Sequence, residues 1–154
     1  MLRTVLVDDV RDIQTTELCR TYAEAFETLC QKKFDVMYLD HDLGCFDPKS
    51  GLDLNGATLI KVLSEGHVEL PKIIVLVSGN PIGSERQRLI LKDLGYKQIK
   101  EYKNDDIHLA GLTIMIFDEE CQGCQYVDTE QCNIASKYRY IKEQTGPCPY
   151  KEVL

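Results

Sequence analysis

Residues 35–44 have the sequence DVMYLDHDLG, an apolar run that ends abruptly in a group of acidic residues. The run at 36–39 contains no charged side chain, which predicts a strand buried on both faces, as in a parallel sheet. Two similar runs, at 2–7 and 72–77, precede and follow it along the chain. The polar residues after the three runs are Asp8-Asp9, Asp40-His41-Asp42 and Ser78-Gly79-Asn80. The pattern predicts neighbouring strands that share a polar carboxyl edge.

Helical patterns alternate with these strands. A capping box at 21–24 predicts a helix that closes at Lys32-Lys33, and residues 55–65 predict a second helix. A further capping box at 84–87 predicts the start of a third helix, which Gly95 ends. Shorter strands are expected at 17–21 and 99–102, whereas residues 105–117 fit a helix or a strand equally well. This alternation predicts an α/β fold, a parallel sheet with helices on both faces.

Carboxylates brought together at one edge of a sheet repel one another unless a cation joins them. Mg²⁺ is the natural choice, because it takes carboxylate oxygens together with phosphate oxygens and water. Asp8, Asp9 and Asp40 are therefore candidate metal ligands, while Ser78 and Asn80 offer donors to a phosphoryl group. A lysine near the last strand, Lys100 or Lys103, is a candidate for an added positive charge. The alternative is that these aspartates only cap helices and form turns.

Over residues 2–103 the chain resembles response-regulator receiver domains. The matching features are Asp8-Asp9, Asp40, the segment 55–60, Ser78 and a lysine after the last strand. The resemblance implies a flavodoxin-like three-layer sandwich. It also implies that Asp8 and Asp9 bind Mg²⁺, that Asp40 accepts a phosphoryl group, and that Ser78 and Lys103 contact that group.

Two departures point to a particular branch. Only one strand and one helix fit between Asp9 and Asp40, so the first receiver helix is expected to be missing or reduced to a turn. The motif Leu39–Gly44 resembles the Leu-Asp-His-Asp-Leu-Gly motif of cyclic-phosphate-processing receiver-like domains, and residues 77–81 (VSGNP) match their second motif in part. The resemblance implies a domain that binds or processes nucleotide or RNA cyclic phosphates as a metal-dependent phosphoesterase, with Asp42 and Asn80 near the phosphate.

Three functions stay open from the sequence. The first is this phosphate chemistry, the second is a signalling switch phosphorylated on Asp40, and the third is a scaffold without chemistry. His41 has two interpretations of equal weight: a general acid that protonates a leaving ribose oxygen, or a residue turned away from Asp40 and Asp42 into a hydrogen bond that shapes the loop. Gly44, Pro48 and Gly51 would allow the insertion at 45–51 to act as a mobile loop over the strand ends.

The last part of the chain has a different composition. Four cysteines suggest a tetrahedral zinc site, with a four-cysteine iron–sulfur cluster and free thiols as alternatives: Cys121, Cys124, Cys132 and Cys148. We therefore expect a receiver-like domain over 1–117 and a metal-binding extension over 118–154. A metal would stabilise a tail that has few apolar residues.

The 154-residue chain carries a net charge of −7 and is 44% hydrophobic. The acidic balance argues against a broad nucleic-acid surface, and no apolar run suggests a membrane span. Seven cysteines without a signal peptide argue for a reducing, cytoplasmic location. The expected partners are a phosphate-bearing small molecule or RNA end, and a protein partner for the switch.

Overall fold

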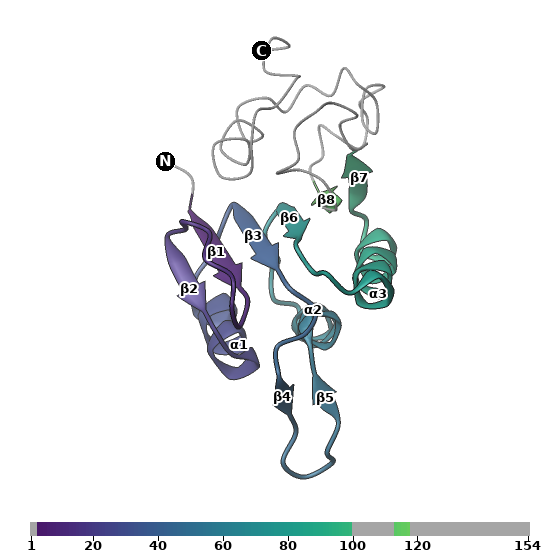
Figure 1. Ribbon diagram of the computed structural model, residues 1–154. Helices are drawn as coiled ribbons and strands as arrows, with labels where there is room; N and C mark the ends of the chain where they lie inside the picture. Colours follow the sequence, from purple (N-terminus) through teal and green to yellow (C-terminus); the bar gives the residue numbers. More distant parts are fainter. Residues whose placement is uncertain (1–2, 100–112, 118–154) are drawn as a thin grey trace, which may run out of the picture.

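The structure is a computed structural model, and it describes residues 3–99 and 113–117. Six strands form the main sheet: β1 (Thr4–Val7), β2 (Glu17–Cys19), β3 (Val36–Leu39), β6 (Ile73–Leu76), β7 (Lys97–Ile99) and β8 (Thr113–Ile116). Two short strands form a separate hairpin: β4 (Cys45–Phe46) and β5 (Asp53–Leu54). The helices are α1 (Tyr22–Gln31), α2 (Gly56–Glu65) and α3 (Pro81–Asp93). Figure 1 shows this arrangement.

The strand order is β2-β1-β3-β6-β8-β7, and β2, β1, β3 and β6 are parallel to their neighbours. Leu6, Tyr38 and Val75 lie side by side in this register. The predicted α/β fold with a parallel sheet is confirmed for these strands. The exception is β8, which pairs antiparallel with both β6 and β7. Residues 113–116 therefore form a strand, although their sequence fits both a helix and a strand.

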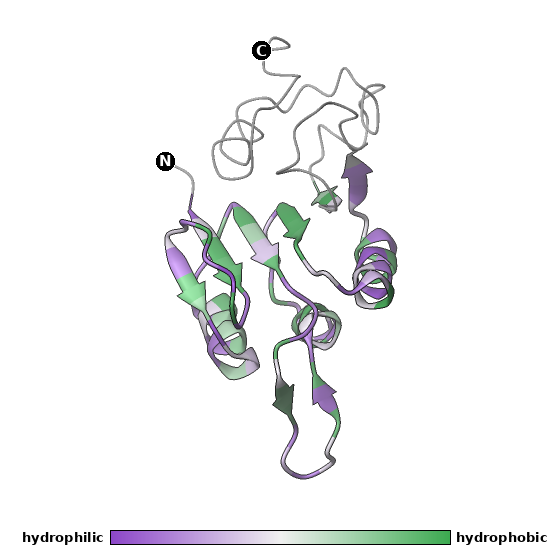
Figure 2. Cartoon of the chain, in the orientation of Figure 1, coloured by the Kyte–Doolittle hydropathy of each residue, from purple (hydrophilic) through white to green (hydrophobic). Residues whose placement is uncertain are grey.

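The three helices of the described residues all pack against one face of the sheet, whereas the sequence predicts helices on both faces. Their buried side chains form one apolar cluster with alternate residues of the central strands, among them Val5, Val7, Met37, Leu39, Ile74, Leu76, Ala25, Leu29, Leu59, Ile60, Leu63 and Leu91. This alternation follows from the two-residue period of a strand. The opposite face is buried as well, since Leu6, Tyr38, Ile73 and Val75 have no exposed surface. In Figure 2, β6 has the green of hydrophobic residues, whereas the helices carry both hydrophobic and hydrophilic residues.

The segment between β1 and β2 contains no helix, which confirms that the first receiver helix is missing. Arg20 holds this segment in place: its guanidinium donates to the carbonyls of Asp8 (3.3 Å) and Arg11 (2.7 Å) and pairs with Asp12 at 2.6 Å. Thr4 and Thr16 exchange further hydrogen bonds across its base. A side-chain network thus replaces a helix as the connection after β1.

Side-chain caps define where the helices begin. Thr21 accepts the amide of Glu24 at the start of α1, as the capping box predicts, and Asn55 accepts the amide of Thr58 at the start of α2. The prediction for α3 is wrong. This helix begins at Pro81, with Asn80 as its cap, three residues before the expected start at Ser84. Proline at the first helical position and asparagine before it are a stronger start signal than the internal Ser-x-x-Gln pattern.

The insertion after β3 forms a hairpin rather than an irregular loop. Strands β4 and β5 pair antiparallel, and Figure 1 shows the hairpin projecting away from the body of the sheet. At its tip the amide of Gly51 donates to the Asp47 carbonyl, and Gly51 has the positive φ of 71° that the turn requires. The expectation of a loop lying over the strand ends is therefore not met by this conformation.

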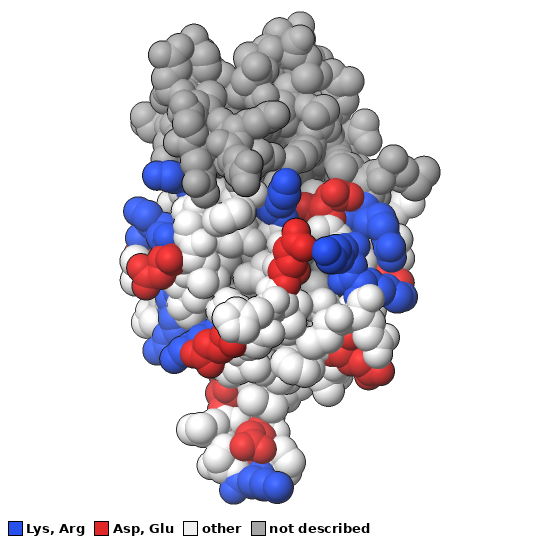
Figure 3. Space-filling model, turned by 180° about the vertical axis from the view of Figure 1, so that it is seen from behind, with Lys and Arg blue, Asp and Glu red and all other residues white. Residues whose placement is uncertain are grey.

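The helices and the surface have two further properties. No described helix combines the length and apolar character of a membrane span. On the face drawn in Figure 3, basic and acidic side chains are interspersed over the described residues.

Candidate metal and phosphate site

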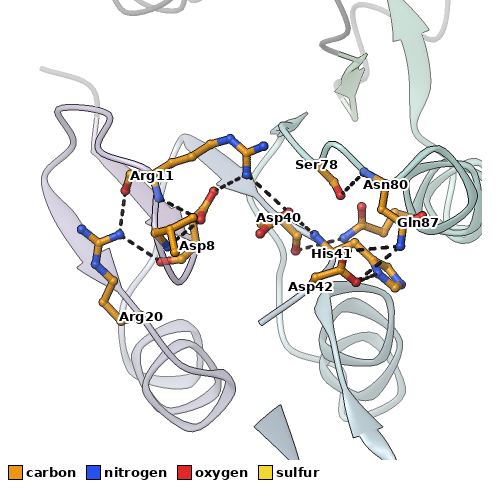
Figure 4. Close-up of polar contacts among 10 residues, drawn as sticks. Asp8, Arg11, Arg20, Asp40, His41, Asp42, Ser78, Asn80 and Gln87 are labelled. Atoms are coloured by element: carbon orange, nitrogen blue, oxygen red, sulfur yellow. Dashed lines mark hydrogen bonds and ion pairs between the residues drawn. The ribbon is translucent and has the colours of Figure 1, made fainter. Parts of the chain in front are cut away.

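The carboxyl ends of β1, β3 and β6 bring the predicted polar residues to one edge of the sheet. Carboxylate oxygens of Asp8, Asp9 and Asp40 all lie within 4.8 Å of one another. Ser78 comes from the end of β6, next to β3, as Figure 4 shows. The convergence follows from the parallel register of the three strands, which aligns Val7 with Leu39 and Leu39 with Leu76. The sequence prediction placed these four side chains together correctly.

Asp8 is fully buried, and its carboxylate organises the chain after β1. Oδ1 accepts the backbone amides of Val10 (2.9 Å) and Arg11 (3.0 Å), while Oδ2 accepts the Arg11 guanidinium at 3.0 Å. This is the turn-forming role that the sequence left as an alternative. Asp8 is a turn residue and a member of the acidic cluster at once.

Asp40 is only 5% exposed, at the end of the central strand β3. Its Oδ1 accepts the backbone amide of His41 at 2.9 Å. Burial and the charge of Asp8 raise the pKa of Asp40, while Arg11, the His41 amide and the Ser78 hydroxyl lower it. The raised pKa means that the ionised carboxylate is stabilised less here than in water. The neighbouring groups supply too little positive charge to offset burial and the second carboxylate.

His41 points into the protein and pairs with the exposed Asp42. The two side chains are joined by a 2.8 Å hydrogen bond between Nδ1 and Oδ1, so His41 is not turned away from Asp42 as one interpretation expected. His41 is 7% exposed, and its Nε2 is buried without a hydrogen-bond partner among the described residues. The hydrogen bond from His41 is the main reason why the pKa of Asp42 is lowered. The imidazole therefore fixes the loop, and its second nitrogen does not face solvent.

Asn80 links this loop to α3. Its Oδ1 accepts the amide of Gly83 at 3.1 Å as the helix cap, and its Nδ2 lies 3.3 Å from Asp42 Oδ2. Its backbone amide donates to the hydroxyl of Ser78 at 3.0 Å. Both side-chain atoms of Asn80 are thus engaged within the protein. Asp42 and Asn80 form one hydrogen-bonded group beside the acidic cluster, and Asp42 is not part of the cluster itself.

Two glycines let α2 and α3 approach the loop after β3. A Cβ at Gly56 would lie 2.3 Å from the Asp40 carbonyl oxygen and 2.2 Å from Nε2 of Gln87, and one at Gly83 would lie 2.3 Å from the His41 ring. Fully buried Gln87 donates to the Asp40 carbonyl at 3.3 Å. The two helices therefore fix the backbone that carries Asp40: α2 contacts it directly at Gly56, and α3 binds it through the Gln87 side chain.

The site also includes three residues that the sequence did not predict: Arg11, Arg20 and Gln87. Arg11 Nη1 lies 3.0 Å from Asp8 Oδ2 and 3.6 Å from Asp40 Oδ1, so it bridges the two buried carboxylates (Figure 4). A signal was present in the sequence, since two arginines flank a segment too short for the missing helix. Gln87 offered none, because a buried glutamine on an otherwise mixed helix looks like a surface residue.

Several predicted residues lie outside the described residues. Among these are Lys100, Lys103 and the four cysteines of the tail: Cys121, Cys124, Cys132 and Cys148. The structure does show where the strand before Lys103 runs. Strand β7 is separated from β6 by β8, so the lysine follows a strand that is not adjacent to the one carrying Ser78.

The donor set at this edge fits a hard divalent cation. Three carboxylates within 4.8 Å provide oxygen ligands of the kind that Mg²⁺ prefers. The raised pKa of Asp40 fits this use, because a divalent charge would stabilise its ionised form. Ser78, which carries a hydroxyl, and exposed Gly79 lie at the neighbouring strand end.

Comparison with known proteins identifies the relationship. A search of curated proteins and a search of solved structures both gave no match. The sequence model of one family, described as the cyclic-phosphate processing receiver domain, matches residues 3–93. The match spans β1 to α3 and so includes all three strand ends of the acidic site. The chain belongs to the cyclic-phosphate processing receiver domain family.

Proposed function

We propose that this protein binds a divalent cation, Mg²⁺, together with a phosphate-bearing ligand at the carboxyl edge of the sheet, and that it opens a nucleotide or RNA cyclic phosphate there. The observation that carries the proposal is the cluster of Asp8, Asp9 and Asp40 beside the Ser78 strand end. Membership of a family described by cyclic-phosphate processing supports the choice of ligand.

The proposed roles follow from what each side chain already contacts. Asp40 and exposed Asp9 supply cation ligands, and Asp8 contributes through Oδ2 once Arg11 has moved aside. Ser78 donates its hydroxyl to a phosphoryl oxygen. Asn80 and Asp42 hold the loop after β3 against the start of α3, because their polar atoms are engaged with each other and with α3.

His41 serves as a positioning residue in this proposal. Its Nδ1 holds Asp42 and its Nε2 is buried against the protein, which leaves no proton-bearing atom facing a ligand at the edge. A general acid must come within hydrogen-bond reach of the oxygen it protonates. In the proposed reaction the oxygen of water therefore bonds to phosphorus, one of the two ester P–O bonds to the ribose breaks, water gives up a proton to solvent, and the leaving ribose oxygen takes a proton from solvent.

The test is ³¹P NMR of the full chain with adenosine 2′,3′-cyclic monophosphate and MgCl₂. We expect the cyclic phosphate signal to be replaced by a phosphomonoester signal, and the conversion to stop when EDTA removes the metal. Asp40→Asn should abolish the conversion, whereas Asp93→Asn, an exposed residue at the end of α3, should leave it unchanged. Unchanged substrate over long incubation, with no Mg²⁺-dependent binding by calorimetry, would refute the proposal.

A second candidate function is a phosphorylated switch. It is favoured by one feature, the strand-end carboxylate of Asp40 beside the Ser78 hydroxyl, the pair that a phosphoryl acceptor needs. Incubation with acetyl phosphate and Mg²⁺ followed by intact-mass measurement distinguishes the two. A gain of about 80 Da that is absent in Asp40→Asn would establish the switch, because only covalent transfer adds mass.

A further inference from the structure

The Arg11 guanidinium lies between the two buried carboxylates of the site, those of Asp8 and Asp40. Its Nη1 contacts Asp8 Oδ2 at 3.0 Å and approaches Asp40 Oδ1 at 3.6 Å. The side chain of Asp8 is 0% exposed and that of Asp40 is 7% exposed, whereas the side chain of Arg11 is 39% exposed. The guanidinium is thus an internal counter-ion for two carboxylates that have little or no contact with solvent.

The guanidinium contacts the same oxygens that a cation would need. Mg²⁺ binds carboxylate oxygens at about 2.0–2.1 Å in near-octahedral geometry. With Nη1 in its present place, a cation between Asp8 Oδ2 and Asp40 Oδ1 would meet a positive group within a few ångströms. Arg11 and the cation are therefore alternatives at this position.

Arg11 can leave the carboxylates without unfolding the loop. Its backbone is held separately: its amide donates to Asp8 Oδ1 at 3.0 Å, and its carbonyl accepts Arg20 Nη1 at 2.7 Å. Only the partly exposed side chain has to move. Since neither backbone bond uses the Arg11 guanidinium, side-chain movement leaves the segment after β1 in place.

The guanidinium also reaches the side of the site where a phosphate would be. A Cβ built on Gly79 would lie 3.9 Å from Arg11 Nη2, so the side chain extends from the end of β1 across β3 to the loop after β6. Gly79 is next to Ser78, whose hydroxyl is the proposed hydrogen-bond donor to the phosphate. Guanidinium groups bind phosphate through two parallel hydrogen bonds, which a lysine cannot reproduce.

We infer that Arg11 couples the two ligands of this site: it neutralises Asp8 and Asp40 in the free protein, moves to the phosphoryl oxygens when a phosphate-bearing ligand binds, and thereby frees the carboxylates for the divalent cation. The inference rests on the proposed function, since it assumes that both ligands bind at this edge. Its consequence is thermodynamic linkage, in which phosphate tightens Mg²⁺ binding and Mg²⁺ tightens phosphate binding by the same factor.

The test is calorimetric titration of the full chain with MgCl₂, with and without inorganic phosphate, in wild type and Arg11→Gln. In wild type, phosphate should tighten Mg²⁺ binding by about fivefold or more, the lower end of typical couplings. Arg11→Gln should bind Mg²⁺ alone more tightly than wild type and phosphate alone more weakly, and the coupling should shrink. A residue that only supported the loop would weaken both.

Two further variants keep the result interpretable. Arg11→Lys retains the positive charge but lacks the planar fork, so Mg²⁺ affinity should stay near wild type while phosphate affinity falls. Arg88→Gln removes a surface arginine that pairs with Glu85 on α3, and it should change neither affinity.

The outcomes separate the inference from the proposed function. If wild type binds both ligands and Arg11→Gln binds Mg²⁺ alone no more tightly, the inference is wrong and the proposed function stands. If wild type binds neither Mg²⁺ nor phosphate, both are refuted.

Discussion

At the residue scale, Asp40 lowers stability at neutral pH in the absence of metal. Burial and the charge of Asp8 raise its pKa above the ordinary value of 3.8, so the folded protein binds this proton more tightly than the unfolded chain. Stability is then lost as the pH rises from about 3.8 through the folded-state pKa. Asp40→Asn removes this loss, because the amide has the same shape and no charge.

We therefore predict that Asp40→Asn is more stable than wild type near neutral pH and that the difference disappears near pH 4. Urea unfolding in EDTA at about pH 4 and about pH 7 measures both. Asp93→Asn is the control, since its side chain is exposed and away from the acidic cluster. A constant difference between wild type and Asp40→Asn across this range would contradict the argument.

Asp40→Asn should also weaken Mg²⁺ binding by about tenfold or more. Even changes in the groups that surround a metal's ligands reduce affinity by roughly 10–100-fold. Calorimetry of the folded mutant measures this directly. Full Mg²⁺ affinity in Asp40→Asn would remove Asp40 from the cation site.

The sequence predicts single residues well where chain position alone decides. Asp8, Asp9, Asp40 and Ser78 follow buried strands, and the parallel register brings them together. Contacts made by long side chains cannot be predicted from chain position in this way. The reach of Arg11 to Asp40 depends on where the turn after Asp8 directs the side chain, and the turn-forming tendency of Asp8 does not determine that direction.

At the scale of elements, α3 depends on Asn80 as its cap. Loss of the Asn80 side chain leaves the Gly83 amide without its side-chain acceptor and removes one of the two hydrogen-bond partners that Asp42 has among the described residues. Asn80→Ala should therefore destabilise the protein by about 0.5–2 kcal/mol. Ser84→Ala, inside the helix, should change stability by less than about 0.5 kcal/mol. Equal effects of the two in urea unfolding would place the start of α3 at Ser84 instead.

The contact of α2 with the Asp40 backbone requires a glycine. A Cβ at Gly56 would overlap the Asp40 carbonyl, so Gly56→Ala should cost about 1–3 kcal/mol in the free energy of unfolding. Gly66→Ala is the matched control, because its Cβ would meet only ordinary contacts at 3.5 and 3.6 Å. That control should be neutral or stabilising by up to about 1 kcal/mol. A harmless Gly56→Ala would show that α2 can move away from the loop.

Elements with strong periodicity are predictable, and β8 shows why others are not. Residues 114–117 (IMIF) are apolar without a break, so a buried helix and a buried strand produce the same pattern. The outcome is decided by the open edge of β6, with which β8 forms four paired positions. That edge is a tertiary feature, which no local window of sequence contains.

At the scale of the whole molecule, the expected second unit at 118–154 remains a sequence prediction. Its four cysteines predict one zinc ion per chain, or an iron–sulfur cluster that colours the protein: Cys121, Cys124, Cys132 and Cys148. Elemental analysis of anaerobically purified protein should find the metal. Cys124→Ser should lose it and become sensitive to proteolysis in the tail while residues 3–99 stay folded. A protein that contains neither zinc nor iron would contradict this prediction.

The architecture as a whole follows from a simple physical rule: buried parallel strands need helical crossovers, and their carboxyl ends share one edge. This rule predicts the sheet from β2 to β6 and the place of the site. It does not predict a crossover that lacks a helix. There the chain after β1 depends on Arg20 and on the carboxylate of Asp8, which are individual side-chain interactions.

The most direct test of the central claim is an amide ¹H–¹⁵N NMR titration of the full chain with MgCl₂ in the presence of adenosine 2′,3′-cyclic monophosphate. We predict saturable shifts concentrated in residues 8–11, 40–42 and 78–80, the three segments after β1, β3 and β6. Asp40→Asn should suppress them. Saturable shifts elsewhere with these three segments unchanged, or no saturable shifts at all, would contradict the assignment of this edge as a metal and phosphate site.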